Sequence, residues 1–300
     1  MDKNIKIGLI GYGYWGKILY KTLLKLGYKN VIICDTNGTG DITDYTQLKK
    51  QEMVELDPYE VSYVLVATPP STHYSICRHL LEKDINVFCE KPLVMDVHEA
   101  YHLYEIAEKE NTKLFTDWTF TYNYAIQRIK QEYDEGLLGS IESITMHRYN
   151  DNIVHIIDGT TCKWDLACHD VSIIQYLVGI LPSKTDWIEY SKKSNKNDSA
   201  FGILSYNNFS ATINVSWTYG DKFRECIFDF TDATIIWDDK TQKLTYKPKQ
   251  NSHFWEETID YSSETSPLEN SINSFISNEI SNINKNITLQ TLKILKWKYL

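Results

Sequence analysis

The stretch IKIGLIGYGYWG, residues 5–16, decides the fold because it reads as a buried strand that runs into a glycine turn. IKIGLIG is apolar at most positions, as expected of a strand that is covered on both faces. The glycines of GYGYWG match the pattern G-x-G-x-x-G, and KILYKTLLKLG after them is typical of a helix that ends at Gly27. A strand, a glycine turn and a helix in this order predict the first unit of a parallel α/β sheet that binds a dinucleotide.

Each glycine of this turn has a separate physical task. Gly11 permits the tight turn, Gly13 lets the backbone approach a pyrophosphate, and Gly16 lets the helix pack closely on the strand. Asp35 ends the next strand, KNVIICD, where its carboxylate would accept hydrogen bonds from ribose hydroxyls. No Arg or Lys occurs between Asp35 and Gln47, so a 2′-phosphate would face a carboxylate without a compensating cation, and we expect NAD rather than NADP. The cofactor-binding residues predicted from the motif are Gly11, Gly13, Tyr14, Trp15, Gly16 and Asp35.

The remainder of the first 120 residues alternates apolar strands with helices, which predicts a Rossmann-type parallel sheet. Strands are expected at 61–70, 85–92 and 112–120, and helices at 73–84 and 97–110. TNGTG, residues 36–40, directly after Asp35, cannot supply a crossover helix, which needs about a dozen residues. It predicts a loop, a short strand near 41–43 and a helix at about 45–55.

From about Asn123 the pattern changes to short strands of alternating character that are joined by turns, between helices at both ends. This change predicts an α+β domain with a large, mostly antiparallel open sheet. The expected strands are SIESITMHRY, AFGILSYN, FSATINVSWTY, RECIFDFTD, ATIIWDD and KLTYKPK. The expected division is a Rossmann NAD-binding domain at 1–120 and a domain for substrate binding and oligomerisation at 121–300, and the fold class is α/β.

Charge and composition exclude several classes of protein. The net charge of −9 and the pI near 5.4 argue against a nucleic-acid partner or an anionic membrane surface. No apolar segment approaches the roughly 18 residues that span a bilayer, and the N-terminus does not resemble a signal peptide. The six cysteines form no CxxC pair and no common zinc spacing, so reduced thiols, a cytoplasmic setting and no metal are expected.

Two further stretches carry chemistry. CEKPL, residues 89–93, ends a parallel strand, where α/β sheets bind their ligands, and Pro92 holds Lys91 extended or follows a cis bond. Lys91 there would present an ammonium group to a substrate oxygen, or else pair with Glu90 as a solvated lysine. KWDLACHD, residues 163–170, opens an apolar helix on which Asp165 and His169 share one face.

These segments resemble the glucose-fructose oxidoreductase / inositol dehydrogenase / rhizopine catabolism (Gfo/Idh/MocA) family. The resemblance rests on GYGYWG, then ATPPSTHY at 67–74, then NVFCEKPL at 86–93, and it continues through DWTFTYN and WDLACHDVSIIQYLVG. It is closest to members linked to nucleotide-sugar metabolism. It implies a Rossmann domain, a second domain whose open sheet forms a homodimer or homotetramer, and hydride transfer between a nicotinamide and a sugar carbon.

The resemblance assigns roles to individual residues. It implies that Lys91 is the family's Glu-Lys-Pro lysine and that Asp165 and His169 are its Asp-x-x-x-His pair. The nicotinamide side of the cofactor would be lined by Thr68, Pro69 and His73. Separately from the resemblance, Glu90 is a further predicted cofactor-binding residue, and Tyr122 and Asn123, just past the domain junction, are predicted to face the sugar or else to belong to the core. The chain departs from the family in the short stretch after Asp35, in Pro70 where Asn is common, and in its shorter length.

The predicted chemistry is oxidation of an alcohol or the reverse reduction. His169 would act as general base because its unperturbed pKa, about 6.5, lies near working pH. Lys91 would stabilise the developing alkoxide, and Asp165 would orient His169 or hold a sugar hydroxyl. Asp170 is expected to cap the helix or to pair locally. The alternative for the other two residues is that Asp165 caps the helix and that His169 is a core histidine.

The predicted function is therefore an NAD(H)-dependent dehydrogenase or ketoreductase that acts on a CH–OH group of a nucleotide-linked sugar. A free polyol or inositol dehydrogenase is one alternative, and a non-catalytic NAD(H)-binding sensor is another. Lys222 and Arg224, in GDKFRE, would reach a phosphate or carboxylate of the substrate or else lie on a solvated strand edge.

Overall fold

The computed structural model describes residues 3–36, 61–151, 160–193, 197–250, 252, 254–277 and 282–296. Its contacts divide the chain into two compact units. The first unit contains Met1–Thr119 and Leu268–Leu289, and the second contains Phe120–Pro267 and Gln290–Leu300. The strand predicted near 41–43 and the helix predicted at about 45–55 lie outside the described residues.

The first unit contains a parallel sheet of five strands in the order β2-β1-β3-β4-β5, which confirms the predicted Rossmann-type domain. All four residues of β1 are buried, as the unbroken apolar run predicted. The order reverses direction after β1, which places the carboxyl ends of β1 and β3 at the switch point where such sheets bind ligands. The strands are β1 (Ile7–Ile10), β2 (Val31–Cys34), β3 (Tyr63–Val66), β4 (Asn86–Cys89) and β5 (Leu114–Thr116).

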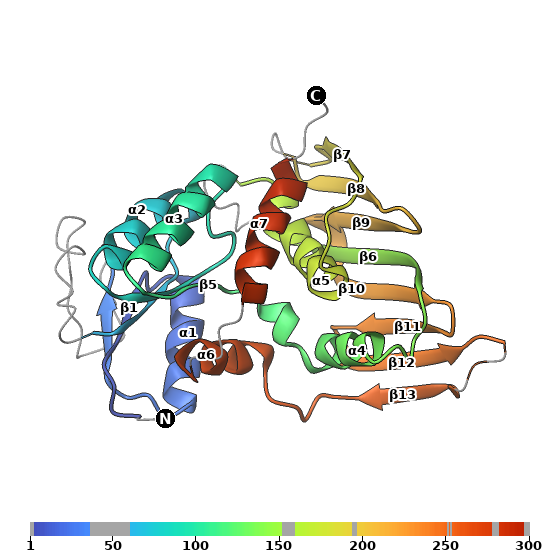
Figure 1. Cartoon of the computed structure of the whole chain (residues 1–300), viewed down its shortest axis with the longest axis horizontal. Coiled ribbons are helices and arrows are strands. Elements are labelled where there is room, and N and C mark those ends of the chain that lie inside the picture. The colour runs from blue at the N-terminus through green and yellow to red at the C-terminus, as the bar shows by residue number, and fades with distance from the viewer. Residues whose placement is uncertain are drawn as a thin grey trace. The chain divides into compact units, whose positions relative to one another are not determined.

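Helices cover both faces of this sheet. Helices α2 (Pro70–Leu81) and α3 (Val97–Lys109) lie on one face, and α1 (Tyr14–Lys25) and α6 (Pro267–Ser277) lie on the other (Figure 1). Helix α2 begins three residues earlier than predicted, with Pro70 in its first turn, where the missing N–H group costs nothing. The ring of Phe275 on α6 packs against the rings of Phe88 and Phe115, with centroids 5.6 and 5.8 Å apart.

Residues 268–289, which the sequence analysis placed in the C-terminal domain, group with the first unit. Helix α7 (Asn282–Lys296) begins there, and the Asn284 amide bonds both the backbone N–H and the carbonyl of Thr116. The indole N–H of Trp118 donates to Thr288, 2.9 Å away. Polar side chains on α7 thus satisfy buried polar groups at and just after the end of β5. The hydrophobic periodicity of the sequence does not reveal these contacts.

The second unit contains a sheet of eight strands in the order β13-β12-β11-β10-β6-β9-β8-β7. All neighbouring pairs are antiparallel except β6 and β9, so the predicted mostly antiparallel sheet is confirmed. The pattern did not predict β7 and β13, which lie at the two edges and are largely exposed. The strands are β6 (Ile141–Asp151), β7 (Lys184–Tyr190), β8 (Ser199–Ser205), β9 (Ser210–Ser216), β10 (Thr218–Phe230), β11 (Ala233–Asp238), β12 (Lys243–Pro248) and β13 (Glu257–Asp260).

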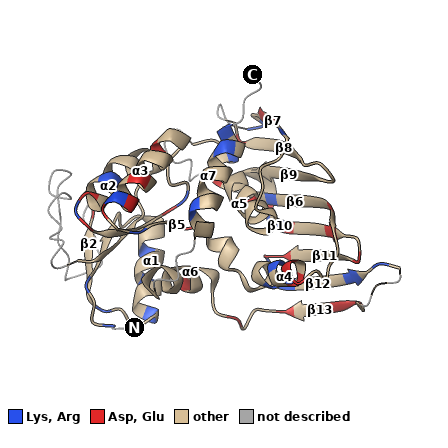
Figure 2. Cartoon of the chain, in the orientation of Figure 1, with Lys and Arg blue, Asp and Glu red and all other residues tan. Residues whose placement is uncertain are grey.

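One face of this sheet is covered by α4 (Tyr124–Asp134) and α5 (Cys168–Val178) (Figure 1). Residues on β10, β11 and β12 alternate between buried and half-buried, so the covered face holds the core of the unit. Figure 2 shows Lys, Arg, Asp and Glu mainly on helices and towards strand ends. A charged residue in the middle of this sheet, such as Arg148 on β6, therefore requires a specific explanation.

Candidate active site

The glycine turn between β1 and α1 has the geometry that a dinucleotide pyrophosphate requires. Gly11 has a φ of +90°, and a Cβ atom there would lie 2.7 Å from the carbonyl oxygen of Ala67. A Cβ atom at Gly16 would lie 2.0 Å from the carbonyl oxygen of Gly11. A Cβ atom at Gly13, in contrast, would meet no atom within 4 Å. Gly11 and Gly16 are therefore required by the fold, whereas Gly13 leaves space for a ligand to approach the backbone.

Asp35 is held against this turn. It directly follows β2, and its Oδ2 atom accepts a hydrogen bond of 2.6 Å from the backbone N–H of Tyr12. Because Tyr12 lies between the first two glycines, the acid and the turn form one site. The carboxylate is half-buried, which suits a group that would accept hydrogen bonds from ribose hydroxyls.

The N-terminus of α1 is suited to an anion. Gly13 is its N-cap, no side chain caps the helix, and its first turn holds no acidic residue. The first N–H groups and the helix dipole together present partial positive charge there. Tyr14 and Trp15 are 68% and 42% exposed, respectively. The residues at this helix end fit the pyrophosphate of NAD.

His73 joins the loops that follow β3 and β4. Its Nδ1 and Nε2 atoms lie 3.0 Å from the carbonyl oxygen of Pro92 and 2.8 Å from that of Thr68. Burial lowers the pKa of His73, and the hydrogen bonds to the carbonyls oppose this shift. The ring is fully buried, so His73 positions the loops that carry Thr68 and Lys91. The peptide bond between Lys91 and Pro92 is cis.

Two buried carboxyl groups stand beside Lys91 at the carboxyl edge of the parallel sheet. Glu90 follows β4 and Asp117 follows β5, which pairs with β4 in register. Glu90 is 7% exposed and Asp117 is 1% exposed. Asp117 accepts hydrogen bonds from the hydroxyls of Ser271 and Thr119, at 2.7 and 2.8 Å. The sequence analysis did not select Asp117, although an acid directly after a parallel strand was the available signal.

The environment raises the pKa of both carboxyl groups. Burial raises the pKa of Glu90 to about 8; the charge of Asp117 adds to the effect and that of Lys91 opposes it. Burial likewise raises the pKa of Asp117 to about 6, against the opposing hydrogen bonds. Unfolded acids have pKa values near 4, so the folded state binds protons more tightly. The pair's contribution to the free energy of unfolding is therefore largest below about pH 4 and is lost as pH rises through both folded pKa values.

We expect Glu90→Gln to remove much of the stability loss that the wild type shows as pH rises. Relative to the wild type, its free energy of unfolding should rise by on the order of a few kcal/mol between about pH 5 and pH 8.5, because the amide never ionises. Urea unfolding at a series of pH values measures this difference. Glu105→Gln, an exposed position on α3, is the matched control and should show no such trend. A difference between Glu90→Gln and the wild type that did not change with pH would contradict the burial argument.

The segment that contains Asp165 differs from the predicted α-helix. Residues Lys163–Ala167 form a π-helical turn, labelled η3, and α5 begins only at Cys168. Such turns are rare and occur frequently at functional sites. Asp165 lies in the π turn and His169 in the first turn of α5, and both are half-buried.

Aromatic side chains position both residues. The indole N–H of Trp217 donates a hydrogen bond of 2.9 Å to Oδ2 of Asp165. The ring of His169 meets that of Phe120 edge-on, with centroids 4.9 Å apart. The carboxylate and the imidazole are thus each held at the mouth of α5 by contacts from elsewhere in the second unit.

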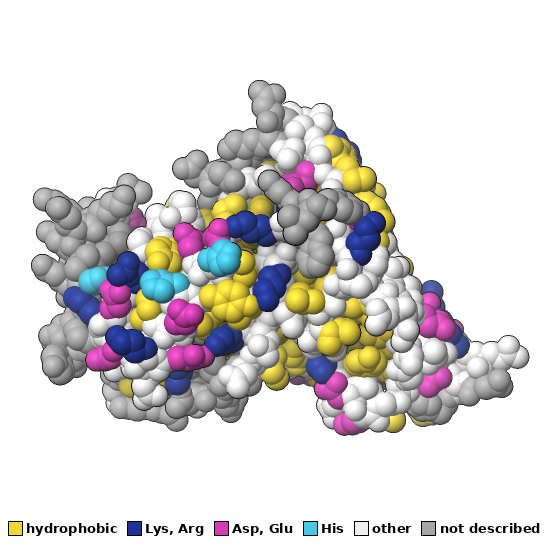
Figure 3. All heavy atoms as spheres, turned by 45° about the horizontal axis from the view of Figure 1, so that its top comes forward, with side chains coloured by type: hydrophobic (Ala, Val, Ile, Leu, Met, Phe, Trp, Pro, Cys, Tyr) yellow, Lys and Arg dark blue, Asp and Glu magenta, His cyan; other side chains and the backbone are white. Residues whose placement is uncertain are grey.

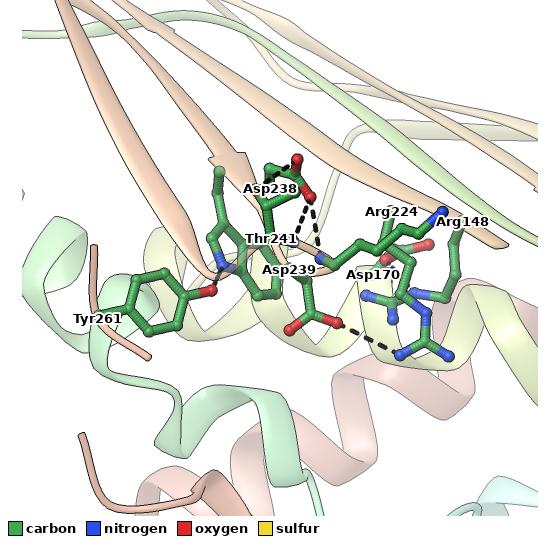
Figure 4. A network of polar contacts seen from close by, with 9 residues as sticks. Arg148, Asp170, Arg224, Asp238, Asp239, Thr241 and Tyr261 are labelled. Atoms are coloured by element: carbon green, nitrogen blue, oxygen red, sulfur yellow. Dashed lines mark hydrogen bonds and ion pairs between the residues drawn. The ribbon is translucent and has the colours of Figure 1, made fainter. Parts of the chain in front are cut away.

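Asp170 has a long-range partner rather than the local one that the sequence analysis expected. Its Oδ1 atom accepts a hydrogen bond of 2.8 Å from Nε of Arg148 on β6. Both side chains are at most 2% exposed, and charges at such depth are tolerated only in pairs. Figure 4 shows this pair beside Arg224 and Asp239.

Tyr122 and Asn123 have different surroundings. Tyr122 ends a short 3₁₀-helix, η2 (Thr119–Tyr122), and is half-buried. Asn123 is 2% exposed, and its side chain accepts a hydrogen bond of 2.9 Å from the N–H of Ala125 as the N-cap of α4. The fold therefore uses Asn123 as a helix cap, and Tyr122 is the stronger candidate for a sugar contact.

The face over α2 and α3, the cysteines and the metal-binding side-chain types of the described residues point to no additional site. Figure 3 shows positive, negative and His side chains interspersed over α2 and α3, so that face has no patch of a single sign. No three His, Cys, Asp or Glu side chains of the described residues are grouped to hold a metal ion. The six cysteines are free and buried. No helix in the described ranges is long and apolar enough to cross a bilayer.

Comparison with known proteins identifies the first unit. Residues 5–117 match the model of an oxidoreductase family with an NAD-binding Rossmann fold, GFO_IDH_MocA. The likeness to the Gfo/Idh/MocA oxidoreductase family is thus shown for this domain, which makes up less than half of the chain. The resemblance inferred from the glycine turn and the Glu-Lys-Pro segment is therefore confirmed.

The curated relatives of this chain are distant in sequence. An uncharacterized oxidoreductase of Bacillus subtilis, YfiI, is 24% identical over 232 residues, which cover 68% of this chain and 58% of the relative. Myo-inositol 2-dehydrogenase of Thermotoga maritima is 23% identical over 58% of this chain and 55% of its own length. The chain thus spans about 58% and 63% of the first two curated relatives.

Solved structures share the fold over almost the whole length of this chain. UDP-N-acetylglucosamine 3-dehydrogenase GnnA from Acidithiobacillus ferrooxidans has a TM-score of 0.84 at 18% identity, over 97% of this chain and 95% of that one. A levoglucosan dehydrogenase in complex with NADH and levoglucosan has a TM-score of 0.81 at 17% identity, over 97% and 95%. At such identities the likeness concerns the fold alone.

Proposed function

We propose that this protein is an NAD(H)-dependent oxidoreductase that transfers a hydride between nicotinamide and a CH–OH or ketone carbon of a sugar. The observation that carries the proposal is the glycine turn with Asp35 bonded to it, at the switch point of a parallel sheet. Lys91 at the carboxyl end of β4 adds a cation on the same edge of that sheet.

Each catalytic role follows from a side chain's surroundings. When bound, NAD supplies the hydride acceptor. Lys91 binds the substrate oxygen and stabilises the negative charge that develops on it. His169 takes the hydroxyl proton in oxidation and returns it in reduction, which its half-buried position permits. Asp165, fixed by Trp217, holds a sugar hydroxyl or orients His169, and Tyr122 contacts the sugar.

The cofactor is NAD rather than NADP in this proposal. The carboxylate of Asp35 is tied to the turn and would repel a 2′-phosphate. We expect NADH to bind at least about tenfold more tightly than NADPH. Asp35→Asn should lower the affinity for NADH about tenfold and so reduce the ratio of the NADH affinity to the NADPH affinity. Fluorescence titration with both dinucleotides measures this. Asp260→Asn, an exposed change in the second unit, is the control.

A panel of substrates tests the reaction itself. Free sugars, cyclitols and UDP- or dTDP-sugars are offered to the protein with NAD, and NADH formation is followed by absorbance. Hydride transfer from a nucleotide-linked sugar would support the proposed substrate class, and transfer only from inositol or a polyol would replace it. Tight NADH binding without transfer from any compound would instead favour an NAD(H)-binding sensor.

The nucleotide-linked sugar is the preferred substrate class because the sequence pattern is closest to members with that role. A homodimer or homotetramer formed through the open sheet is part of the same proposal. The face opposite α4 and α5 supports it, since half-buried residues alternate with core residues along β11 and the last five residues of β10.

A further inference from the structure

Two arginines lie side by side on the covered face of the eight-stranded sheet. Arg148 on β6 and Arg224 on β10 are register partners across the strand pair, so their side chains leave the same face. Arg148 bonds Asp170 of α5, which fixes that face as the one the helices cover. Figure 4 shows both guanidinium groups with Asp170 and Asp239. Neighbouring guanidinium groups repel each other, so their pairing needs a compensating reason.

The protein satisfies these guanidinium groups incompletely. Nε of Arg148 donates to Asp170, and Nη1 of Arg224 lies 3.3 Å from Oδ2 of Asp239. Nη1 of Arg148 and Nε of Arg224 are buried and have no hydrogen-bond partner within the described ranges. Neither pair is the bidentate fork that guanidinium and carboxylate groups favour. Donor capacity therefore remains beside Arg224 for an additional acceptor.

A third cation adjoins the pair. Lys222 stands two residues before Arg224 on β10, and the charge of Arg224, followed by burial, lowers the pKa of Lys222. Burial, followed by the charge of Arg148, lowers the pKa of Arg224. These three cations are opposed by the carboxylates of Asp239 and Asp170. Among these groups, one positive charge is left without a counter-charge.

The three cations differ in their exposure to solvent. The side chain of Arg148 is 2% exposed and that of Arg224 is 20% exposed, whereas Lys222 is exposed. A ligand would thus meet Lys222 and Arg224, while Arg148 raises the positive potential from behind.

The cluster adjoins His169 within the second unit. The guanidinium carbons of Arg148 and Arg224 lie 4.3 and 5.9 Å from the ring centre of Phe120. The same ring meets His169 edge-on at 4.9 Å. One phenylalanine ring therefore contacts both the arginines and the proposed general base.

We propose that Arg224 and Lys222, supported by Arg148, bind an anionic oxyacid group, a carboxylate or a phosphate, carried by the substrate. Only the identification of this ligand as a sugar substrate rests on the proposed function. The site itself is a property of the second unit and is testable without hydride transfer. Charge-assisted hydrogen bonds from a guanidinium fork are the strong interactions by which proteins recognise both groups.

Calorimetric titration of the full chain tests the site with UDP, glucose 1-phosphate, glucuronate and neutral glucose as probes. Excess NADH is present, so that the glycine turn is filled. At least one anionic probe should bind more tightly than glucose. The probe that binds tightest shows whether the site prefers a nucleotide diphosphate, a sugar phosphate or a carboxylate. Arg224→Gln should weaken that probe about 10- to 100-fold. Lys222→Gln should weaken it by a smaller factor, about 3- to 10-fold, because its ammonium is exposed.

Lys247→Gln, which removes an exposed charge from β12, is the matched control and should leave the affinity unchanged. Equal losses in Lys247→Gln and Arg224→Gln, unchanged affinity in Arg224→Gln, or no preference for any anion would each overturn the site. If Arg224→Gln fails to fold, Lys222→Gln decides the question. NADH titration of the same variants separates the two proposals: an anion effect with no NADH binding would contradict the proposed function and leave this site standing.

Discussion

His169→Asn is expected to lower kcat by about 10²- to 10⁴-fold, the range that a general base contributes. Asparagine keeps a polar group beside Phe120 but takes up no proton near neutral pH. The affinity for NADH should stay unchanged, because the cofactor residues of the first unit are untouched. Steady-state kinetics with the active sugar from the panel, together with an NADH titration, measure both quantities.

Lys91→Met should cause a loss of similar size, about 10²- to 10³-fold, by removing the cation that stabilises the alkoxide. If both residues act on one transition state, the double variant should lose little more than the worse single variant, because residues that work as a unit are not additive. His98→Asn, an exposed change on α3, is the control. Near wild-type kcat/KM in His169→Asn, or full additivity in the double variant, would remove the assigned roles.

The second large effect is expected at Gly16. Gly16→Ala would place a Cβ atom 2.0 Å from the carbonyl oxygen of Gly11, and this neighbour is backbone rather than a flexible side chain that could move aside. We expect a loss of about 3 kcal/mol or more in the free energy of unfolding, and a fall in Tm of about 10 °C. NADH binding should be lost with it, because α1 must move away from the strand end. Thermal melting and NADH fluorescence together measure the change.

Gly13→Ala is the matched comparison in the same turn. Gly13 has a φ of −71°, which alanine adopts readily, and its Cβ atom would meet nothing within 4 Å. The free energy of unfolding should therefore fall by only about 1 kcal/mol, the amount by which alanine is a poorer N-cap than glycine. NADH affinity should nevertheless fall at least about tenfold, because the new methyl group occupies the approach of the pyrophosphate. Unchanged NADH affinity in Gly13→Ala would mean that no pyrophosphate binds at this turn.

Local sequence features predicted the fold because they depend on neighbours along the chain. The unbroken apolar runs before Gly11 and Lys91 became parallel strands, and the alternating runs after Asn123 became the mostly antiparallel sheet. The exposed edge strands β7 and β13 were missed, since an edge strand buries too little to leave a clear pattern. The π turn at Lys163–Ala167 was also missed, because its composition is that of an ordinary helix.

For the candidate site, the sequence by itself selected the glycine turn, Asp35, Lys91 and the pair Asp165 and His169, because each lies in a short motif that can be recognised along the chain. Only the tertiary structure placed Asp117 beside Glu90, Arg148 beside Arg224, and residues 268–289 with the first unit. The physical reason is that a buried charge must find a partner, and the partner is selected by strand register and helix packing rather than by distance along the chain.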